Sequence, residues 1–557
     1  MSSDRHTNPL SSQGLLWWQR GVIYQIYPRS FLDTTGNGIG DLQGVIEKLD
    51  YLNDGTEAPL GIDAIWLSPI FLSPMADFGY DVANYCDVHP LFGDLATFDR
   101  LVAEAHRRGI KIIIDWVPNH SSDQHPWFIE SRSSRDNPKR DWYVWRDPRP
   151  DGDDIDGRRL PNNWLSVFGG PAWEWDETTG QYYLHSFLKE QPDLNWRNPA
   201  VKEAMFDVIR FWLERGVDGF RIDVAHYIMK DPQMRDNPTN PNPQGMLQKP
   251  PREYDTLLHL YDKGHPDVHA VFREFRQLLD AYSAEQPRYS VGEIHIFDWQ
   301  KWASYYGEDL DELHMPFNFA LLHVAWEAQE IREVVDSLEA AIPPGAWPNY
   351  VLGNHDESRT ASRYGHSYAR VAAMLLLTLR GIPTLYYGDE IGMADVPIPP
   401  ERQQDPFGMR EPGFGRDPNR TPMQWDASLN AGFSDVEPWL PVSGDYATRN
   451  VAIQSGDPTS MLNLYRRLLG YRRGSPALYG GSYQPLDVGD DHCFVYLRAA
   501  GDERRLIALN FTDEQRCVSV PGEDEGRIAI STHLDREERV SLSGLTLRPH
   551  EGVIIVL

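Results

Sequence analysis

Apolar and polar positions along the chain follow a repeating order of short apolar runs and longer amphipathic segments. Apolar runs of about four to eight residues are typical of buried strands, and apolar residues three or four positions apart are typical of helices. The first units are a strand from Val22 to Tyr27, a helix from Leu42 to Leu52, a strand from Ile62 to Leu67 and a helix from Leu95 to Arg108. Strands that alternate with helices through short links predict a parallel sheet with helical crossovers.

The alternation continues along the chain after one interruption and gives eight predicted strands. They are Val22–Tyr27, Ile62–Leu67, Ile110–Val117, Gly219–Asp223, Tyr289–Ile294, Leu313–Phe319, Trp347–Gly353 and Thr384–Tyr387. A (β/α)8 TIM barrel has eight strands joined by helical crossovers. The sequence therefore predicts a fold of the α/β class with this architecture.

Two regions depart from this pattern. Residues 121–193 are rich in Trp, Pro, Asp and Gly and predict a small inserted domain after the third strand. From about residue 482 onward, short alternating strands predict a C-terminal antiparallel β-sandwich. The expected division is a polar N-terminal tail (1–14), a barrel (15–120 and 194–475), the insertion (121–193) and the sandwich (476–557).

The composition of the chain indicates which binding partners and which cellular compartment are expected. The net charge of −29 disfavours nucleic acid and anionic membrane surfaces, both of which would repel the chain. Three cysteines predict no disulfide framework and fit a reducing compartment. Because the N-terminus lacks an apolar signal segment and no apolar run reaches about 18 residues, we expect a cytoplasmic protein. Aromatic residues (12%) suit both a core and a sugar-binding cleft.

Carboxylates stand at the ends of several predicted strands. Arg221 and Asp223 lie two residues apart on a strand and so point to the same side. A structural ion pair would explain these two alone, but the arrangement recurs, and the carboxyl ends of barrel strands meet on one face. Acids beside an Arg and two His suit acetal cleavage, in which one acid is protonated and another ionised. The residues gathered are Asp115, His120, Arg221, Asp223, Glu293, His355 and Asp356.

The loop from Asp33 to Asp41 resembles a calcium-type loop. Oxygen-bearing residues alternate with glycines there, which lets a tight turn fold several oxygens around one cation. The alternative is a Gly/Asn turn without metal. A phosphate cradle is excluded because no Gly-Lys-Ser/Thr follows. The expected ligands of a structural Ca²⁺ (or Mg²⁺) are Asp33, Thr35, Asn37, Ile39 and Asp41.

Four motifs in order resemble those of glycoside hydrolase family 13, the α-amylase family. They are Asp115-Trp-Val-Pro-Asn119-His120, Gly219-Phe-Arg221-Ile-Asp223, Val291-Gly-Glu293 and Asn354-His355-Asp356. Two further segments, Gln191 to Asn195 and Gly415 to Trp425, are similar to those of the bacterial α-glucosidase and oligo-1,6-glucosidase branch.

The resemblance implies a retaining exo-acting α-glucosidase that releases α-glucose from short α-1,4 or α-1,6 glucosides, with transfer to an acceptor sugar as a side reaction. Asp223 would be the nucleophile, Glu293 the acid and base, and Asp356 the residue that grips the distorted ring. Asp77 and Arg420 would form an ion pair that closes the pocket. The implied substrate-binding residues are Asp77, Tyr80, His120, Arg221, His355 and Arg420.

The resemblance also implies no organic cofactor, a small saccharide as partner, and a monomer or small homo-oligomer. Val224 after the nucleophile goes with α-1,6 links in this branch, whereas the following Ala225-His226 is unusual for it. Two alternatives stay open. One is a trehalose- or sucrose-converting hydrolase or isomerase, and the other is a non-catalytic barrel, which would be expected to lack Asp223, Glu293 or Asp356.

Overall fold

The eight predicted strands form one parallel sheet in the computed structural model, which describes residues 14–56, 59–155, 157–245 and 249–557. The sheet order is β13-β12-β11-β5-β2-β1-β15-β14. The predicted (β/α)8 barrel is confirmed, and the strand bounds agree to within a few residues. The strands are β1 (Ile23–Ile26), β2 (Ala64–Leu67), β5 (Lys111–Trp116), β11 (Gly219–Ile222), β12 (Tyr289–Glu293), β13 (Met315–Phe317), β14 (Asn349–Val351) and β15 (Ile382–Tyr386).

A side chain joins the two end strands of this sheet. The amide of Asn349, on β14, donates to the carbonyl oxygen of Pro316 at 2.7 Å and accepts from the main-chain N–H of Asn318 at 3.0 Å. Both partners belong to β13 or its end. The buried Asn349 amide therefore forms hydrogen bonds between β13 and β14. Between the other neighbouring strands of the sheet, main-chain hydrogen bonds make this connection.

Alternate residues of each strand face opposite sides, as a period of two requires. On β5, Ile113 packs inside the barrel with Ala64, Trp66 and Val291. Its neighbours Ile112 and Ile114 belong instead to the large core between the strands and the outer helices. Since both faces are buried, these strands are apolar along almost their whole length.

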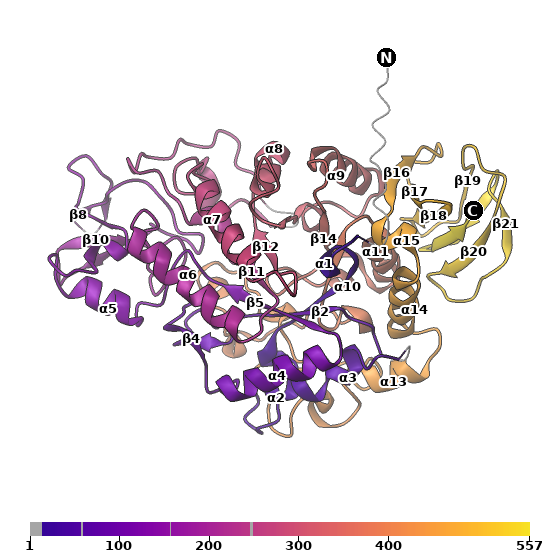
Figure 1. Ribbon diagram of the computed structural model, residues 1–557, viewed down its shortest axis with the longest axis horizontal. Coiled ribbons are helices and arrows are strands. Elements are labelled where there is room, and N and C mark those ends of the chain that lie inside the picture. Colours follow the sequence, from indigo (N-terminus) through magenta and orange to yellow (C-terminus); the bar gives the residue numbers. More distant parts are fainter. Residues whose placement is uncertain (1–13, 57–58, 156, 246–248) are drawn as a thin grey trace, which may run out of the picture.

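Helices cover the outside of the barrel, as Figure 1 shows. Asp94 caps α4 by accepting from the main-chain N–H of Thr97, and Asn198 with Pro199 begins α6. The predicted helix Leu42–Leu52 is two helices, because Lys48 leaves helical geometry (φ −103°, ψ 5°). The helices are α1 (Trp17–Arg20), α2 (Leu42–Glu47), α3 (Leu49–Leu52), α4 (Leu95–Arg107), α5 (Pro126–Ser133), α6 (Pro199–Glu214), α7 (Val268–Ala281), α8 (Trp299–Ala303), α9 (Ala328–Ala341), α10 (Thr360–Tyr364), α11 (His366–Thr378), α12 (Pro406–Arg410), α13 (Val451–Gly456), α14 (Met461–Arg473) and α15 (Pro476–Gly480).

Smaller sheets lie at the two ends of the molecule in Figure 1. At one end, β6 (Trp145–Arg146), β9 (Trp173–Asp176) and β10 (Gln181–Leu184) form an antiparallel sheet within the stretch expected to be an insertion, beside β7 (Asp154–Ile155) and β8 (Arg158–Arg159). β3 (Phe71–Leu72) pairs with β4 (Asn84–Val88) near the barrel.

At the other end, a six-stranded antiparallel sheet packs through one apolar cluster against a two-stranded sheet, which agrees with the predicted C-terminal β domain. The larger sheet contains β16 (Ser482–Leu486), β17 (Cys493–Ala500), β18 (Glu503–Asn510), β23 (Gly552–Val556), β20 (Glu525–Ser531) and β21 (Arg539–Ser541), and the smaller one contains β19 (Arg516–Val518) and β22 (Leu545–Leu547).

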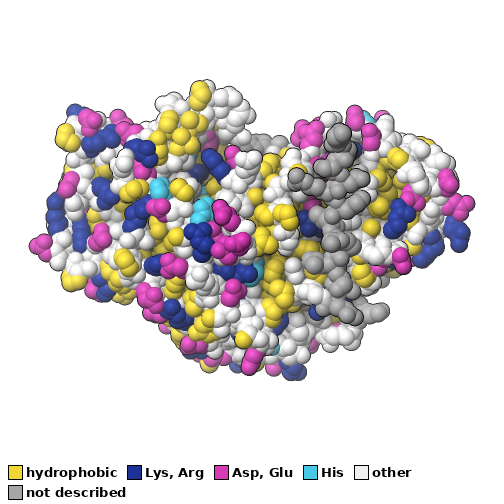
Figure 2. All heavy atoms as spheres, turned by 45° about the horizontal axis from the view of Figure 1, so that its top comes forward, with side chains coloured by type: hydrophobic (Ala, Val, Ile, Leu, Met, Phe, Trp, Pro, Cys, Tyr) yellow, Lys and Arg dark blue, Asp and Glu magenta, His cyan; other side chains and the backbone are white. Residues whose placement is uncertain are grey.

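The expected tail 1–14 lies outside the described residues except for Gly14. Within the described ranges, no helix has the length and apolarity needed to cross a membrane. Figure 2 shows basic and acidic side chains interspersed over one face of the molecule, with no continuous field of either sign in that view.

Candidate active site

Arg221 connects the acids at the carboxyl ends of three adjacent strands. Its Nη1 donates to Asp115 Oδ1 and to Asp223 Oδ1, each at 2.8 Å, and its Nη2 contacts Glu293 Oε2. Asp115 lies directly beside Arg221 in the β5–β11 register, and Glu293 ends β12. All four side chains are buried. The structure therefore brings together the acids that the sequence placed at separate strand ends.

The acids around Arg221 have unequal proton affinities. Burial raises the pKa of Asp223 well above its usual range, and Arg221 offsets this only in part. Burial also raises the pKa of Glu293, but Arg221 and His295 outweigh that effect and hold it below its usual range. Burial raises the pKa of Asp115 to about 6 against the pull of Arg221. Without a ligand, Asp223 therefore has the higher proton affinity of the pair that it forms with Glu293.

Val224 has a strained backbone between the two acids. Its φ of +37° is in the left-handed region, which a β-branched residue rarely adopts. The conformation points the Val224 N–H at Glu293 Oε2, 3.2 Å away, while the side chain packs with Phe168, Phe187 and Tyr227. Strain at this position thus accompanies a direct contact between the Asp223 segment and Glu293.

His355 and Tyr80 form a stacked pair beside Asp115. Their rings lie 5.5 Å apart at 7°, and Tyr80 Oη contacts His355 Nε2 at 2.6 Å and Asp115 Oδ2 at 3.3 Å. Gln25 of β1 holds the other ring nitrogen of His355 at 2.8 Å. Burial lowers the pKa of His355 to about 3, so this imidazole is neutral. Both predicted residues are at the site, with fixed orientations.

The predicted ion pair between Asp77 and Arg420 is wrong. Asp77 pairs with Arg416 at 2.8 Å, whereas Arg420 donates to Asp356 Oδ1 at 2.8 Å and to the carbonyl oxygen of His355 at 2.7 Å. These two bonds turn the buried Arg420 toward Asp356. Arg416, four residues earlier on the same loop, also contacts Asp405 at 2.7 Å and Asp356 at 3.2 Å. Arg416 is therefore the cation that joins Asp77 to Asp356.

His120 is connected to the insertion through Gln191. The Gln191 amide contacts His120 Nε2 at 3.2 Å and donates to Asp77 Oδ2 at 3.2 Å. Nearby, Lys230 and Asp193 form a buried ion pair at 2.6 Å. Gln191 belongs to the segment Gln191 to Asn195, and its contacts bring that segment to the site.

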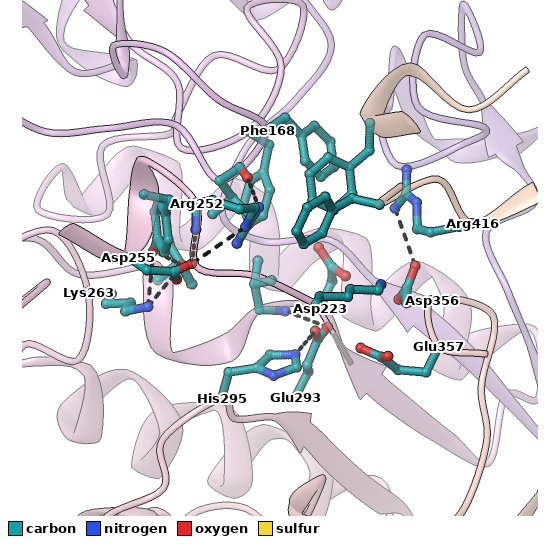
Figure 3. Close-up of a pocket in the computed structure, with 18 of the residues that line it drawn as sticks. Phe168, Asp223, Arg252, Asp255, Lys263, Glu293, His295, Asp356, Glu357 and Arg416 are labelled. Atoms are coloured by element: carbon teal, nitrogen blue, oxygen red, sulfur yellow. Dashed lines mark hydrogen bonds and ion pairs between the residues drawn. The ribbon is translucent and has the colours of Figure 1, made fainter. Parts of the chain in front are cut away.

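These residues line a cavity of about 510 Å³, which Figure 3 shows in close-up. Its floor holds Asp223, Glu293 and Asp356. Sequence reasoning missed most of its walls, which come mainly from the insertion and from loops without motifs. Some of the missed residues had a local signal: His295 and Glu357 lie just after Glu293 and Asp356, and Arg416 belongs to the segment Gly415 to Trp425. The missed residues include Phe168, Phe187, Tyr227, Lys249, Arg252, Lys263, His295, Phe297, Glu357, Phe407, Phe414 and Arg416.

The loop from Asp33 to Asp41 offers oxygen atoms but uses some of them itself. Asp33 accepts from the main-chain N–H groups of Thr35, Gly36 and Gly38 and from Ser434 Oγ. Asp41 accepts from Thr34 and caps α2. In the part of the chain that the structure describes, no three His, Cys, Asp or Glu side chains are grouped to hold a metal. A cation here would depend on Asn37, Thr35 and main-chain oxygens besides the two carboxylates.

Comparison with known proteins gives matches over nearly the whole chain. The model of the alpha-amylase catalytic domain matches residues 25–481. A probable alpha-glucosidase of Rhizobium meliloti is 43% identical over 98% of this chain and 99% of its own, and an oligo-1,6-glucosidase of Parageobacillus thermoglucosidasius is 37% identical over 96% and 98%.

Solved structures are also similar to this chain over nearly its whole length. The crystal structure of an alpha-glucosyl transfer enzyme has a TM-score of 0.90 at 41% identity and covers 97% of this chain and 99% of that one. The trehalulose synthase of Pseudomonas mesoacidophila MX-45 has a TM-score of 0.87 at 35% identity, with coverage of 98% and 100%.

Proposed function

Because the chain belongs to the α-amylase family, as its four motifs predicted, we propose that it is a retaining, exo-acting α-glucosidase of short α-glucosides. One observation carries the mechanism: Asp223 and Glu293 both contact the same buried guanidinium at the cavity floor. This shared contact favours the short carboxyl separation of retaining enzymes, about 5–5.5 Å, over the wider spacing of inverting ones.

Asp223 attacks the anomeric carbon and forms a covalent glucosyl intermediate, while Glu293 protonates the departing oxygen. Glu293 then acts as a base toward water, or toward an acceptor hydroxyl in glucosyl transfer. Asp356, held by Arg416 and Arg420, accepts hydrogen bonds from the ring hydroxyls. Arg221 keeps Asp223 oriented for attack.

These roles need the proton on Glu293, whereas the ligand-free site favours it on Asp223. We expect substrate to favour the opposite protonation states, with Asp223 ionised and Glu293 protonated. The partial positive charge of the anomeric carbon favours ionised Asp223, and the glycosidic oxygen, an acceptor, favours a protonated Glu293 that donates to it.

A buried ionic cluster beside Asp356 supports exo action. Asp77, Arg416 and Asp405 form this cluster. A glucose whose 2- and 3-hydroxyls face Asp356 would have its non-reducing end near the cluster, and we infer that the cluster blocks a further sugar unit there. We therefore assign the pocket-closing role to Asp77 and Arg416.

A trehalose- or sucrose-converting enzyme is the second candidate, because a trehalulose synthase is among the similar structures. Wild type and Glu293→Gln are each incubated with maltose, isomaltose, trehalose and sucrose, and the products are separated by chromatography. Glucose from maltose or isomaltose, reduced by about 10² to 10⁴ in the variant, supports the α-glucosidase. Isomeric disaccharides from trehalose or sucrose would favour the second candidate. Inactivity of both proteins on every sugar would contradict both.

We further propose that the loop from Asp33 to Asp41 holds a structural Ca²⁺ or Mg²⁺. The expected result of dialysis against EDTA is a lower Tm that CaCl₂ restores, with kcat at 25 °C unchanged. Calcium about 100-fold above its Kd would stabilise the fold by about 2.7 kcal/mol. Thermal melts with and without calcium measure this. Asp33→Asn should lose the calcium response. An EDTA-insensitive Tm would mean that the loop's own hydrogen bonds suffice.

A cytoplasmic location is also proposed. Cys86, Cys493 and Cys517 are all free thiols in the structure, which fits a reducing compartment. Oligomeric state stays a prediction of monomer or small homo-oligomer, which light scattering of the purified chain would measure.

A further inference from the structure

His295 touches Glu293 but has no task in the mechanism above. Its Nε2 lies 2.7 Å from Glu293 Oε1, and Figure 3 draws the contact as a dashed line beside Asp223. Glu293 ends β12, and His295 follows two residues later. The other carboxylate oxygen of Glu293 faces Arg221 and the Val224 N–H. Glu293 is thus held through both of its carboxylate oxygens.

The His295 ring is fixed and yet reachable by water. It stacks on Phe319 with centroids 4.7 Å apart at 10°. The side chain lines the cavity and is 34% exposed, whereas Glu293 is 9% exposed. A proton can therefore pass between solvent and His295 more directly than between solvent and Glu293.

Other titratable groups surround this pair. His226 contacts the carbonyl oxygen of Glu293 at 3.2 Å, and its ring lies 6.2 Å from that of His295. Burial lowers the pKa of His226 well below its usual range and that of His323 to about 3, so both stay neutral near pH 7. Of these three imidazoles, His295 is the one whose ring contacts the Glu293 carboxylate. The other ionisable neighbours are Asp115, Arg221, Asp223, Lys249, Lys263, Asp356, Glu357 and Arg363.

We propose that His295 is a positioning residue that also stores the proton which Glu293 delivers to the leaving group. The proposal rests on the α-glucosidase function. An imidazole is the side chain that ordinarily changes charge near neutral pH. A separation of 2.7 Å is a hydrogen-bond distance whether the proton is on nitrogen or on oxygen, so transfer requires no movement of the ring.

Protons balance through the cycle, which begins once Asp223 has released its own proton to solvent as substrate binds. The N–H bond of the imidazolium breaks as the O–H bond of Glu293 forms, which leaves neutral His295 and a carboxylic acid. The acid gives this proton to the glycosidic oxygen as the C–O bond to the anomeric carbon breaks and Asp223 bonds to that carbon. In the second step the Glu293 carboxylate takes a proton from water, and His295 can receive it again.

The test is the pH dependence of kcat/KM for maltose or isomaltose in His295→Gln. Gln keeps an N–H donor but holds no exchangeable charge. With two sites for one proton, the pair loses its last proton at a higher pH than the carboxyl alone. We therefore expect the basic limb to move about one pH unit lower, with an approximately tenfold loss of kcat/KM at pH above the limb and little change in KM.

His323→Gln is the matched control, because it removes a neutral cavity imidazole that, among the described residues, makes no hydrogen bond with the Glu293 carboxylate. Its basic limb should coincide with that of the wild type. His295→Asn is measured in parallel as a second variant, and circular dichroism checks that each protein is folded. A wild-type basic limb in the His295 variants would overturn the proposal, even if kcat fell. An inactive wild type would instead contradict the α-glucosidase function.

Discussion

Replacing Asp223 with Asn is expected to lower kcat by a factor on the order of 10⁴ to 10⁶, with a small change in KM. The amide cannot form the covalent intermediate, while its size leaves the cavity floor intact. The loss should persist with 4-nitrophenyl α-glucoside, whose leaving group needs no acid, because nucleophilic attack itself is absent. Initial rates on this substrate and on maltose measure the effect.

Asp115→Asn provides the matched control for that result. Asp115 contacts the same Arg221 nitrogen at the same 2.8 Å, so this variant replaces an equivalent carboxyl group beside the same guanidinium. We expect it to lose far less activity, because Asp115 supports Arg221 from behind and does not line the cavity. Equal losses in the two variants would indicate that Asp223 acts only by orienting Arg221.

Replacing Arg221 is expected to have the second-largest effect. Arg221→Lys should lower kcat/KM by about 10² to 10³, because a single ammonium group cannot span Asp115, Asp223 and Glu293 as a planar guanidinium does. Arg221→Met should also destabilise the fold by about 3–5 kcal/mol, since it leaves buried carboxylates without their cation. Activity assays and thermal melts of both variants measure these effects.

The stability loss in Arg221→Met should depend on pH with a definite sign. Without the guanidinium, the pKa values of Asp115 and Asp223 in the folded state rise further above those of the unfolded chain, and the pKa of Glu293 rises from below its unfolded value. The folded variant therefore binds more protons than the folded wild type, so the stability lost through the substitution grows as pH rises. The Tm deficit relative to wild type should therefore be larger at pH 8 than at pH 5. A deficit that does not vary with pH would point to lost packing instead.

Much of the fold and the position of the site followed from local sequence pattern. The strands of the barrel are buried on both faces and alternate with amphipathic helices, so their number and order were predicted correctly. Asp115, Asp223, Glu293 and Asp356 could be placed together in advance, because the carboxyl ends of all barrel strands meet on one face. The family motifs then assigned their expected roles.

Only the tertiary structure decided which residues form the walls of the cavity and which charged residues pair with one another inside it. Arg416 and Arg420 lie four residues apart on one loop, and the sequence does not indicate which of them pairs with Asp77. In the structure, Arg420 donates hydrogen bonds to Asp356 and to the His355 carbonyl oxygen and does not pair with Asp77. Asp77 forms its ion pair with Arg416.

The same holds for protonation and backbone strain. Sequence alone determined that several acids lie together on one face of the barrel. The ends of the strands can be read from local sequence pattern, and parallel strands of a barrel place these ends on the same face. Which acid holds the proton, which arginine closes the pocket, and why Val224 tolerates a φ of +37° depend on distances between segments far apart in the chain. Those distances are set by packing of the insertion and the long loops, which have no periodic pattern to read.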